Sequence, residues 1–281
     1  MAIEEIDSEI RREIETRLAR IRIDQGIEFL LAIESGSRAW GFPSPDSDYD
    51  VRFIYLGRPQ DYLTLWPIRD VIERPIVDDL DVNGWDIRKA LRLLLKHNAV
   101  VAEWIASPIR YVADHPVIGS LAELADTYFN PHGYALHYAS LGQNNLNRWD
   151  ANANSIPAKR YFYALRPALS VRALRLDPTN RPPMRLQELM AVCDLSTSLT
   201  EEIDHLVRLK ASRREAADTK RSPSIEMLIV EELGKADEVP ARRNDAEFLE
   251  AANTLFRSLV LPQSSTYRGP GPATAARSSR L

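Results

Sequence analysis

Cysteine is nearly absent from this sequence, since Cys193 is the only one among 281 residues. A lone cysteine excludes a disulfide within the chain and a zinc site built on several cysteines, and it fits a reducing cytoplasm. The five histidines show no metal-ligand spacing. We therefore expect a cytoplasmic protein without a disulfide partner, with Cys193 as a core residue.

Long apolar runs and a strong excess of one charge are also missing. No apolar run approaches the roughly 20 residues that cross a bilayer, and the acidic, amphipathic N-terminus does not have the pattern of a signal peptide. Lys and Arg number 36 against 40 Asp and Glu, which gives a formal net charge of -4. This balance argues against a protein that coats nucleic acid through bulk charge, although a local basic groove is compatible with it. We expect no membrane partner.

What the sequence does have is a compact polar pattern between two predicted strands. An apolar run over residues 28–34 predicts a buried strand, and Gly36-Ser37 predicts the turn after it. A second strand begins at Asp48, so Asp48 and Asp50 point the same way. Two convergent carboxylates repel each other unless they share a proton or bind a cation. Mg²⁺ prefers oxygen ligands and phosphates, and backbone amides at the glycine turn suit a phosphate.

These residues resemble a known signature. Gly36-Ser37 followed by Asp48-x-Asp50 resembles the DNA polymerase β-type nucleotidyltransferase superfamily. The string GSRAWGFPSPDSDYDVRFIY, with GWDIRKAL and EWIASPIRY downstream, resembles its YcgL/RlaP-type branch, some members of which are associated with RNA repair. The resemblance implies transfer of a nucleoside monophosphate from an NTP such as ATP to an acceptor hydroxyl, by attack at the α-phosphorus, with Mg²⁺ or Mn²⁺ as cofactor.

A two-metal site of this kind needs a further carboxylate. In the superfamily that the chain resembles, it lies on a neighbouring strand, and a third strand is predicted at about 77–86. Asp86 is the expected ligand, because it ends this strand within GWDIRKAL. Asp81 is the alternative, and Asp86 could instead serve only as the N-cap of the helix that follows. The expected catalytic and metal-binding set is Asp48, Asp50 and Asp86.

Basic and aromatic residues complete the predicted nucleotide site. Lys159, Tyr163 and Arg166 fall at i, i+4 and i+7, so they share one helix face. Such a face can bind a triphosphate and stack a base, or it can be a solvent-facing stripe. Arg38, like Arg52, flanks the carboxylates and suits either a phosphate or a neighbouring Asp. The expected nucleotide-binding residues are Gly36, Ser37, Arg38, Lys159, Tyr163 and Arg166.

The element pattern predicts an α+β protein in two parts. Residues 1–115 should form a nucleotidyltransferase-like catalytic domain with a small mixed β-sheet and a continuous helix at about 87–105. Residues 116–262 should form an all-helical domain, with the site between the two parts. The Ser-, Pro-, Gly- and Ala-rich stretch 263–281 is expected to be disordered.

Three functions are compatible with these features. The first is nucleotide transfer to a hydroxyl, which could belong to an RNA end, a protein or a small molecule. The second is a sensor that binds Mg·NTP without turnover. The third is a non-catalytic interaction protein whose helical half carries the partner surface. The complete set of three carboxylates favours the transferase.

Overall fold

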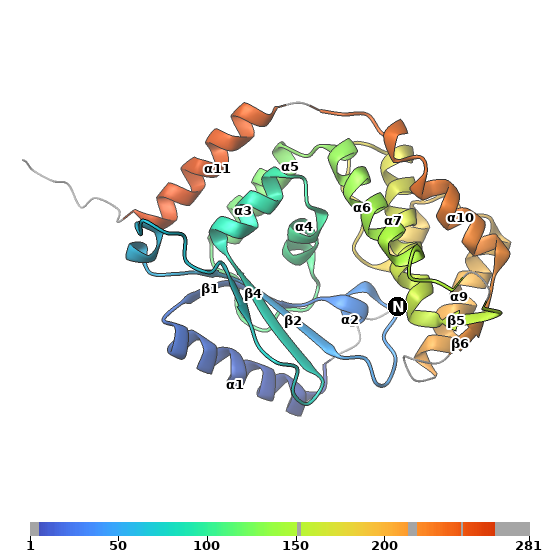
Figure 1. Cartoon of the computed structure of the whole chain (residues 1–281), viewed down its shortest axis with the longest axis horizontal. Helices are drawn as coiled ribbons and strands as arrows, with labels where there is room; N and C mark the ends of the chain where they lie inside the picture. Colours follow the sequence, from blue (N-terminus) through green and yellow to red (C-terminus); the bar gives the residue numbers. More distant parts are fainter. Residues whose placement is uncertain (1–5, 151–152, 213–217, 243, 262–281) are drawn as a thin grey trace, which may run out of the picture.

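The computed structural model describes residues 6–150, 153–212, 218–242 and 244–261, so the predicted tail at 263–281 lies outside the described residues. A mixed four-stranded sheet in the order β1-β2-β4-β3 forms the centre of the first part (Figure 1). β2 runs antiparallel to β1 and parallel to β4, which is antiparallel to β3. The strands are β1 Glu28–Glu34, β2 Tyr49–Leu56, β3 Val71–Glu73 and β4 Leu80–Asp86. This mixed sheet with surrounding helices confirms the predicted α+β class.

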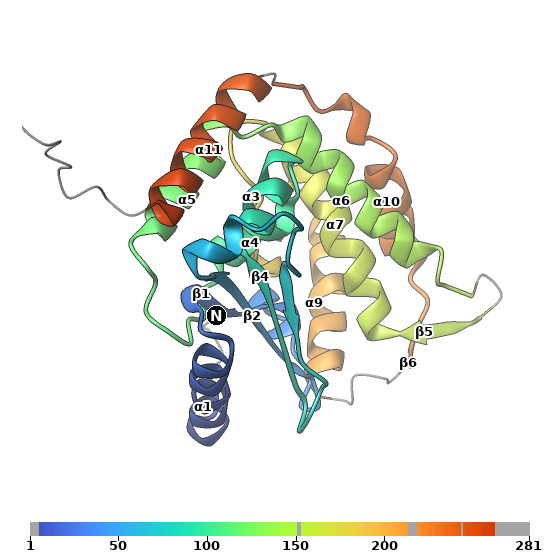
Figure 2. The same cartoon turned by 60° about the vertical axis from the view of Figure 1, so that its left-hand side comes forward.

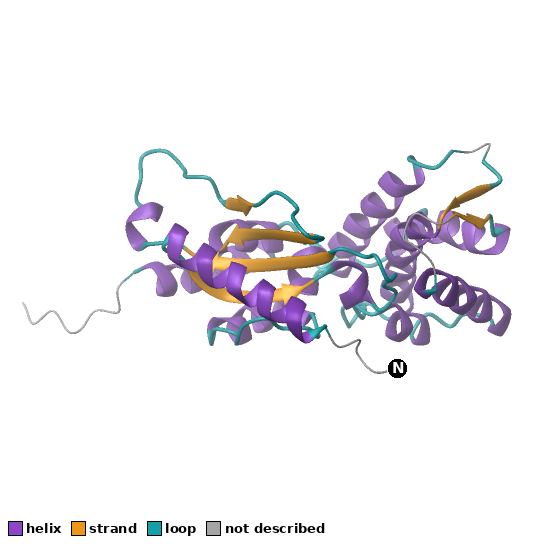
Figure 3. Cartoon of the chain, turned by 90° about the horizontal axis from the view of Figure 1, so that it is seen from below, coloured by secondary structure: helices purple, strands orange, loops and turns teal. Residues whose placement is uncertain are grey.

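Helix α1 (Ser8–Gln25) covers one face of the sheet (Figure 3). It begins after Asp7, whose carboxylate accepts hydrogen bonds from two backbone amides of the first turn, and it ends at Gly26 in a left-handed conformation. The residues that pack between α1 and the sheet are alternate residues of the strands and one stripe of the helix: Ile14, Leu18, Ile21, Val51, Phe53, Tyr55, Leu80 and Val82. Helix α1 thus buries one apolar stripe against this face of the sheet.

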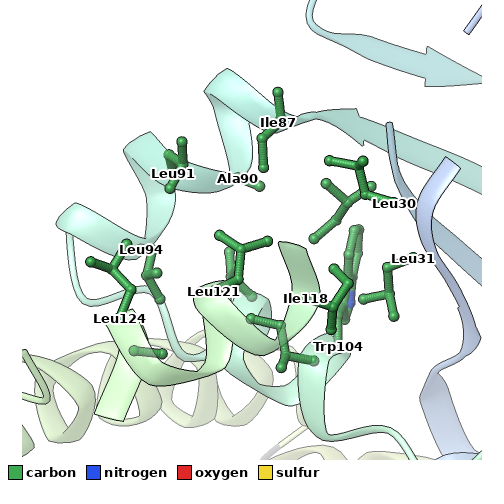
Figure 4. Close-up of a cluster of buried hydrophobic side chains, with 14 of the residues drawn as sticks. Leu30, Leu31, Ile87, Ala90, Leu91, Leu94, Trp104, Ile118, Leu121 and Leu124 are labelled. Atoms are coloured by element: carbon green, nitrogen blue, oxygen red, sulfur yellow. The ribbon is translucent and has the colours of Figure 1, made fainter. Parts of the chain in front are cut away.

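Helices α3 (Ile87–Leu95), α4 (Ala99–Ala106) and α5 (Val117–Thr127) cover the other face of the sheet, and α11 (Asp245–Val260) packs on α3 and α5. Their apolar side chains meet those of β1 in one buried cluster (Figure 4), which includes Leu30, Leu91, Trp104, Leu121 and Leu124. Each fully buried side chain of this size contributes about 2 kcal/mol of stability. Helix α11 lies beside α5 (Figure 2), so a segment near the end of the chain completes the core of the first part.

The prediction of one continuous helix at about 87–105 is wrong, because two helices occupy this range. The chain leaves α3 after Leu95, and His97 adopts a left-handed conformation with φ 54°. Asn98 then caps α4, because its side chain accepts a hydrogen bond from the amide of Val100 at 3.0 Å. The break turns α4 so that both helices can bury their apolar faces against the sheet.

The second part is built around helix α7, which is buried along most of its length. Apart from a short antiparallel ladder, the described elements here are helical. They are α6 Pro131–Leu146, β5 Ser155–Pro157, α7 Ala158–Leu176, α8 Leu186–Ala191, α9 Thr197–Ala211, β6 Asp218–Lys220 and α10 Pro223–Leu233. Three short helical turns complete the described chain: α2 Gly36–Trp40, η1 Pro59–Tyr62 and η2 Ala236–Glu238. None of the helices in the described ranges has the length and apolar character needed to cross a membrane.

Candidate active site

The predicted glycine turn packs directly against a carboxylate. Gly36 begins α2 at φ +59°, and a Cβ placed on it would lie 1.8 Å from Oδ2 of Asp50. Glycine therefore serves twice here, through its left-handed conformation and through the space it leaves. The amide of Ser35 also donates to the carbonyl of Asp50 at 2.8 Å. Together these contacts fix the Asp50 carboxylate beside the Gly36-Ser37 turn.

The parallel pairing of β2 with β4 places Asp50 opposite Asp81. Nη2 of Arg52 lies 2.7 Å from Oδ1 of Asp50 and 2.7 Å from Oδ2 of Asp81. Asn83 donates to the other oxygen of Asp81 at 2.6 Å. Arg52 thus pairs with carboxylates, which was one of the two roles considered for it, and its charge offsets their repulsion.

Electrostatics connect Asp50 with two further predicted residues. Burial raises the pKa of Asp50 above its usual value, and the charge of Arg52 lowers it. Asp81 and Asp48 also raise this pKa, whereas Lys159 lowers it. Asp48, Asp81 and Lys159 are therefore close enough to act on the charge of Asp50. A residue from α7 in the second part thus faces the carboxylates of the sheet.

Glu34 is a buried carboxylate of this region that the sequence analysis missed. It is fully buried, and it accepts hydrogen bonds from the Asp50 amide at 3.0 Å and the Tyr111 hydroxyl at 2.6 Å. Burial is the main reason that its pKa rises to about 7. A charged residue at the end of an otherwise apolar strand was the available signal.

Asp86 does not join the other carboxylates. In the β2–β4 register Asp86 is opposite Tyr55, five residues along the strands from the Asp50–Asp81 pair. Because five is an odd number, the Asp86 side chain points to the opposite face of the sheet from that of Asp81. Its Oδ1 accepts the amide of Arg88 at 2.7 Å, which caps α3, and its Oδ2 accepts the Tyr62 hydroxyl at 2.8 Å. The structure therefore corrects the expected convergence: Asp81, the alternative, is the carboxylate beside Asp50.

Ser37 and Arg38, two of the expected nucleotide-binding residues, both contact other residues of the protein. Ser37 is buried. The guanidinium of Arg38 lies 4.0 Å over the ring of Tyr49, and its Nη2 donates to the carbonyl of Ser47 at 2.8 Å. Arg38 therefore stabilises the connection between the glycine turn and Asp48. These two contacts are with Ser47 and Tyr49 and not with a neighbouring Asp.

Lys159, Tyr163 and Arg166 lie along the face of α7 that contacts α2. The Tyr163 ring meets the Trp40 ring edge to face at 5.5 Å, and Nζ of Lys159 lies 5.6 Å from the Tyr163 ring. The guanidinium of Arg166 lies 4.7 Å over Trp40. Trp40, which sequence reasoning did not single out, is therefore the contact between α7 and the glycine turn.

Arg166 differs from the other two residues because it is buried. Only 4% of it is exposed, Nη2 pairs with Oε1 of Glu103 at 2.7 Å, and Nε donates to the carbonyl of Met184 at 3.0 Å. Its charge is thus neutralised within the protein. The spacing predicted that the three residues share a helix face, but it did not predict that Arg166 is buried in an ion pair with Glu103.

The loop between the glycine turn and Asp48 is also held by the second part. Lys210, at the end of α9, is 1% exposed, and its Nζ lies 3.2 Å from Oγ of Ser44. Nε2 of Gln187 donates to the carbonyl of Gly41 at 2.7 Å. A buried lysine and an amide from two different helices therefore fix the loop that carries Asp48.

The chemistry of the carboxylates fits a divalent cation. Asp48, Asp50 and Asp81 supply the oxygen ligands that Mg²⁺ prefers. Arg52 lies between Asp50 and Asp81, and among the described residues no three Asp, Glu, His or Cys side chains form a metal-binding group. A divalent ion held by both carboxylates would therefore take over the charge compensation that Arg52 provides.

Comparison with known proteins gives the family. The chain is 34% identical over 262 residues to the uncharacterized protein YcgL of Bacillus subtilis (strain 168), and the match covers 93% of this chain and all of YcgL. The model of the RNA repair pathway DNA polymerase beta family matches residues 10–258. Both findings confirm the resemblance that began with Gly36-Ser37 and Asp48-x-Asp50. The protein whose fold and carboxylate pair are described above belongs to the RNA repair pathway DNA polymerase beta family.

Proposed function

We propose that the protein is a divalent-metal-dependent nucleotidyltransferase that moves a nucleoside monophosphate from an NTP to an acceptor hydroxyl. The observation that carries this proposal is the placement of Asp50 beside Asp81, with Gly36 packed against Asp50. An RNA end is the acceptor that the family's name favours. A polymerase beta-like family indicates nucleotidyl transfer as the reaction class.

Asp48, Asp50 and Asp81 are the proposed ligands of Mg²⁺, and Asp81 takes the role first expected of Asp86. Bound there, a divalent ion supplies Lewis acidity for the α-phosphoryl group and the attacking hydroxyl. Arg52 pairs with both Asp50 and Asp81 and so offsets the repulsion between them. Asn83, which donates to Asp81, fixes the orientation of that carboxylate.

The nucleotide is proposed to bind between the glycine turn and α7. Backbone amides at Gly36 and Ser37 suit phosphate oxygens. Lys159, whose charge already acts on Asp50, is the proposed partner of the triphosphate, and the half-buried Tyr163 ring offers a surface for the base. Arg166 and Arg38 are proposed as positioning residues, because each is engaged with protein groups that hold the turn or its loop.

One observation favours the sensor as a second candidate. Both carboxylates of the Asp50–Asp81 pair are engaged by Arg52, and a protein that only binds Mg·NTP needs no further rearrangement than the release of this arginine. Transfer to a protein or a small-molecule hydroxyl is the other variant of the proposal. Both alternatives use the same carboxylates, so the labelled acceptor and the binding of Mg·NTP distinguish them.

The test is transfer of label from each α-³²P-NTP in the presence of Mg²⁺. Total RNA, total protein and a small-molecule extract serve as separate acceptors. Asp50→Asn removes a proposed ligand, and Asp86→Asn is the matched control on the same sheet. Label on one acceptor class that is lost in Asp50→Asn and kept in Asp86→Asn supports the proposal and identifies the acceptor. Binding of Mg·NTP without label on any acceptor would replace the transferase with the sensor.

A further inference from the structure

A pocket lies between α4, α6 and the segment that leads into α8. Its volume is about 320 Å³, within the range of small-molecule sites. We call it the α4–α6 pocket and define it by Ala102, Glu103, Ala106, Tyr134, Arg181 and Arg185. Its lining contains neither the Asp50–Asp81 pair nor the Gly36-Ser37 turn. The pocket is therefore distinct from the proposed transfer site.

One wall of this pocket is flat and apolar. Ala99, Ala102 and Ala106 lie along one face of α4, and their small side chains leave room against the helix. Pro182 and Pro183 also line the pocket and have no amide hydrogen to donate. A flat ring fits such a surface better than a branched or strongly hydrated group.

The inner part of the pocket carries polar groups that can form further hydrogen bonds. Tyr134 is 2% exposed, and its hydroxyl has no hydrogen-bond partner within the part of the chain that the structure describes. An unpaired buried hydroxyl costs about 1–3 kcal/mol, so its presence indicates a missing partner. The hydroxyl of Tyr138 and Nη2 of Arg166 both contact Oε1 of Glu103, each at 2.7 Å. Oε2 of the same carboxylate is thus suited to accept from a ligand.

The outer part of the pocket carries two arginines. The side chains of Arg181 and Arg185 are 22% and 15% exposed, whereas that of Glu103 is 9% exposed. Their partners are the exposed carboxylates of Asp126 at 2.6 Å and Glu188 at 4.0 Å. Exposed ion pairs of this kind contribute at most about 1 kcal/mol. A phosphate, which arginine binds in bidentate geometry, can replace them at little cost.

We propose that the α4–α6 pocket binds a nucleoside monophosphate. The base lies on the alanine face with its N–H groups toward Glu103 and its acceptors toward Tyr134, and the phosphate lies at Arg181 and Arg185. This order follows the chemistry of the pocket, which offers an acceptor and a hydroxyl inside and cations outside. Binding here needs no divalent ion, because the protein itself supplies the positive charge.

The pocket also has a physical connection to the glycine turn. Glu103 holds Arg166, and the Arg166 guanidinium lies over Trp40, the last residue of α2. A ligand that engages Glu103 therefore changes the environment of the residue that supports α2. This coupling, unlike the binding itself, rests on the proposed function, and it predicts that a bound monophosphate changes the rate of nucleotide transfer.

The experiment is isothermal titration of the full chain with AMP, GMP, CMP and UMP in EDTA. Ribose 5-phosphate and the free nucleosides test whether base and phosphate are both required. Ala106→Phe fills the pocket from its exposed rim at the last residue of α4. Ala211→Phe is the matched control, because Ala211 is the exposed last residue of α9. Arg185→Gln is a second variant that removes charge and adds no bulk.

We expect one monophosphate to bind per chain, with affinity reduced about tenfold or more in Ala106→Phe and Arg185→Gln, the scale for losing a hydrogen bond to a charged group. Ala211→Phe and the Asp50→Asn variant should bind like the wild type. Absence of monophosphate binding to the wild type would overturn the proposal. Binding that survives both pocket variants but is lost in Asp50→Asn would also overturn it. Loss of label transfer leaves this titration unaffected, so failure of the proposed function is recognised separately.

Discussion

Asp81 and Asp86 lie five residues apart on the same strand, and their surroundings are opposite in character. Asp81 is partly exposed and shares Arg52 with a second carboxylate. Asp86 is buried, caps α3 and accepts a hydrogen bond from Tyr62. One carboxylate thus lies beside Asp50 under a shared arginine, and the other caps a helix and binds a tyrosine hydroxyl. The difference shows that a position at the strand end does not bring a carboxylate next to Asp50, because strand parity and the register with the neighbouring strand determine which residue lies there.

The largest expected effect separates these two carboxylates by activity. Asp81→Asn should lower the rate of nucleotide transfer by about a hundred- to a thousandfold, the scale for losing a group that stabilises charge in the transition state. Asp86→Asn should stay close to the wild-type rate, because its contacts are structural. Initial rates of label transfer measure both. A larger loss in Asp86→Asn would reverse the comparison and restore Asp86 as the third carboxylate.

The second expected effect concerns Glu34 and the pH dependence of stability. The pKa of Glu34, beside Asp50, is raised from 4.5 to about 7, mainly by burial. Between these values the folded state holds a proton that the unfolded state has released, so stability should fall as the pH rises through this window. The integrated loss is about 3 kcal/mol.

Glu34→Gln should remove this fall, because an amide does not titrate and still offers a carbonyl oxygen to the Asp50 amide. Urea unfolding at a series of pH values between 4.5 and 7 gives the measurement. Equal slopes in the wild type and the variant would show that Glu34 does not hold its proton in the folded protein.

The third expected effect concerns two glycines with the same backbone conformation. Gly36 has φ +59° with the Asp50 carboxylate in the place of a Cβ, whereas Gly26 has φ +60° with no heavy atom within 4 Å. Gly26→Ala should cost only the conformational strain, about 1 kcal/mol. Gly36→Ala should cost about 2 kcal/mol more and also reduce transfer, because Asp50 must move.

Thermal or urea unfolding of both variants gives the difference, and label transfer reports on Asp50. If the two alanine variants lose the same stability, the close approach of Gly36 to Asp50 does not restrict this position.

The smallest expected effect concerns the structural role of Asp86. Asp86→Ala removes the N-cap of α3 and the partner of the Tyr62 hydroxyl, and it should cost about 1–2 kcal/mol of stability. Asp81→Ala should cost less, because Arg52 retains Asp50 as a partner. Denaturant midpoints at pH 7 compare the two. A greater loss from Asp81→Ala would contradict the division into a structural and a ligand-facing carboxylate.

Much of the sheet could be predicted because its signals are local. The apolar run at 28–34 and the alternation after Asp48 gave the first two strands, and Gly36-Ser37 gave the turn. The alternation of side chains along the third strand is also local, and it places Asp81 and Asp86 on opposite faces. The choice between them could not be made from parity alone, because it depends on the parallel register between β2 and β4, which pairs residues about 30 positions apart.

Other features needed information that spacing does not contain. Periodicity placed Arg166 on one helix face with Lys159 and Tyr163, but burial against Glu103 depends on how α4 packs against the second part. The break between α3 and α4 did have a local signal, since Asn98 is a favourable N-cap residue within an apolar stretch. The burial of Lys210 could not be predicted, because charged residues near a helix end are usually exposed.

Helix α11 affects the order in which the parts of the protein can fold during synthesis. Its residues Phe248 and Ala252 belong to the same buried cluster as Leu91 and Leu121, which the ribosome delivers much earlier. During synthesis the parts of α3 and α5 that α11 covers therefore stay exposed to water until the chain has passed residue 260. The first part therefore cannot complete its folding during synthesis before the second part has been made. A chain that ends before α11 would expose an apolar surface to chaperones and proteases.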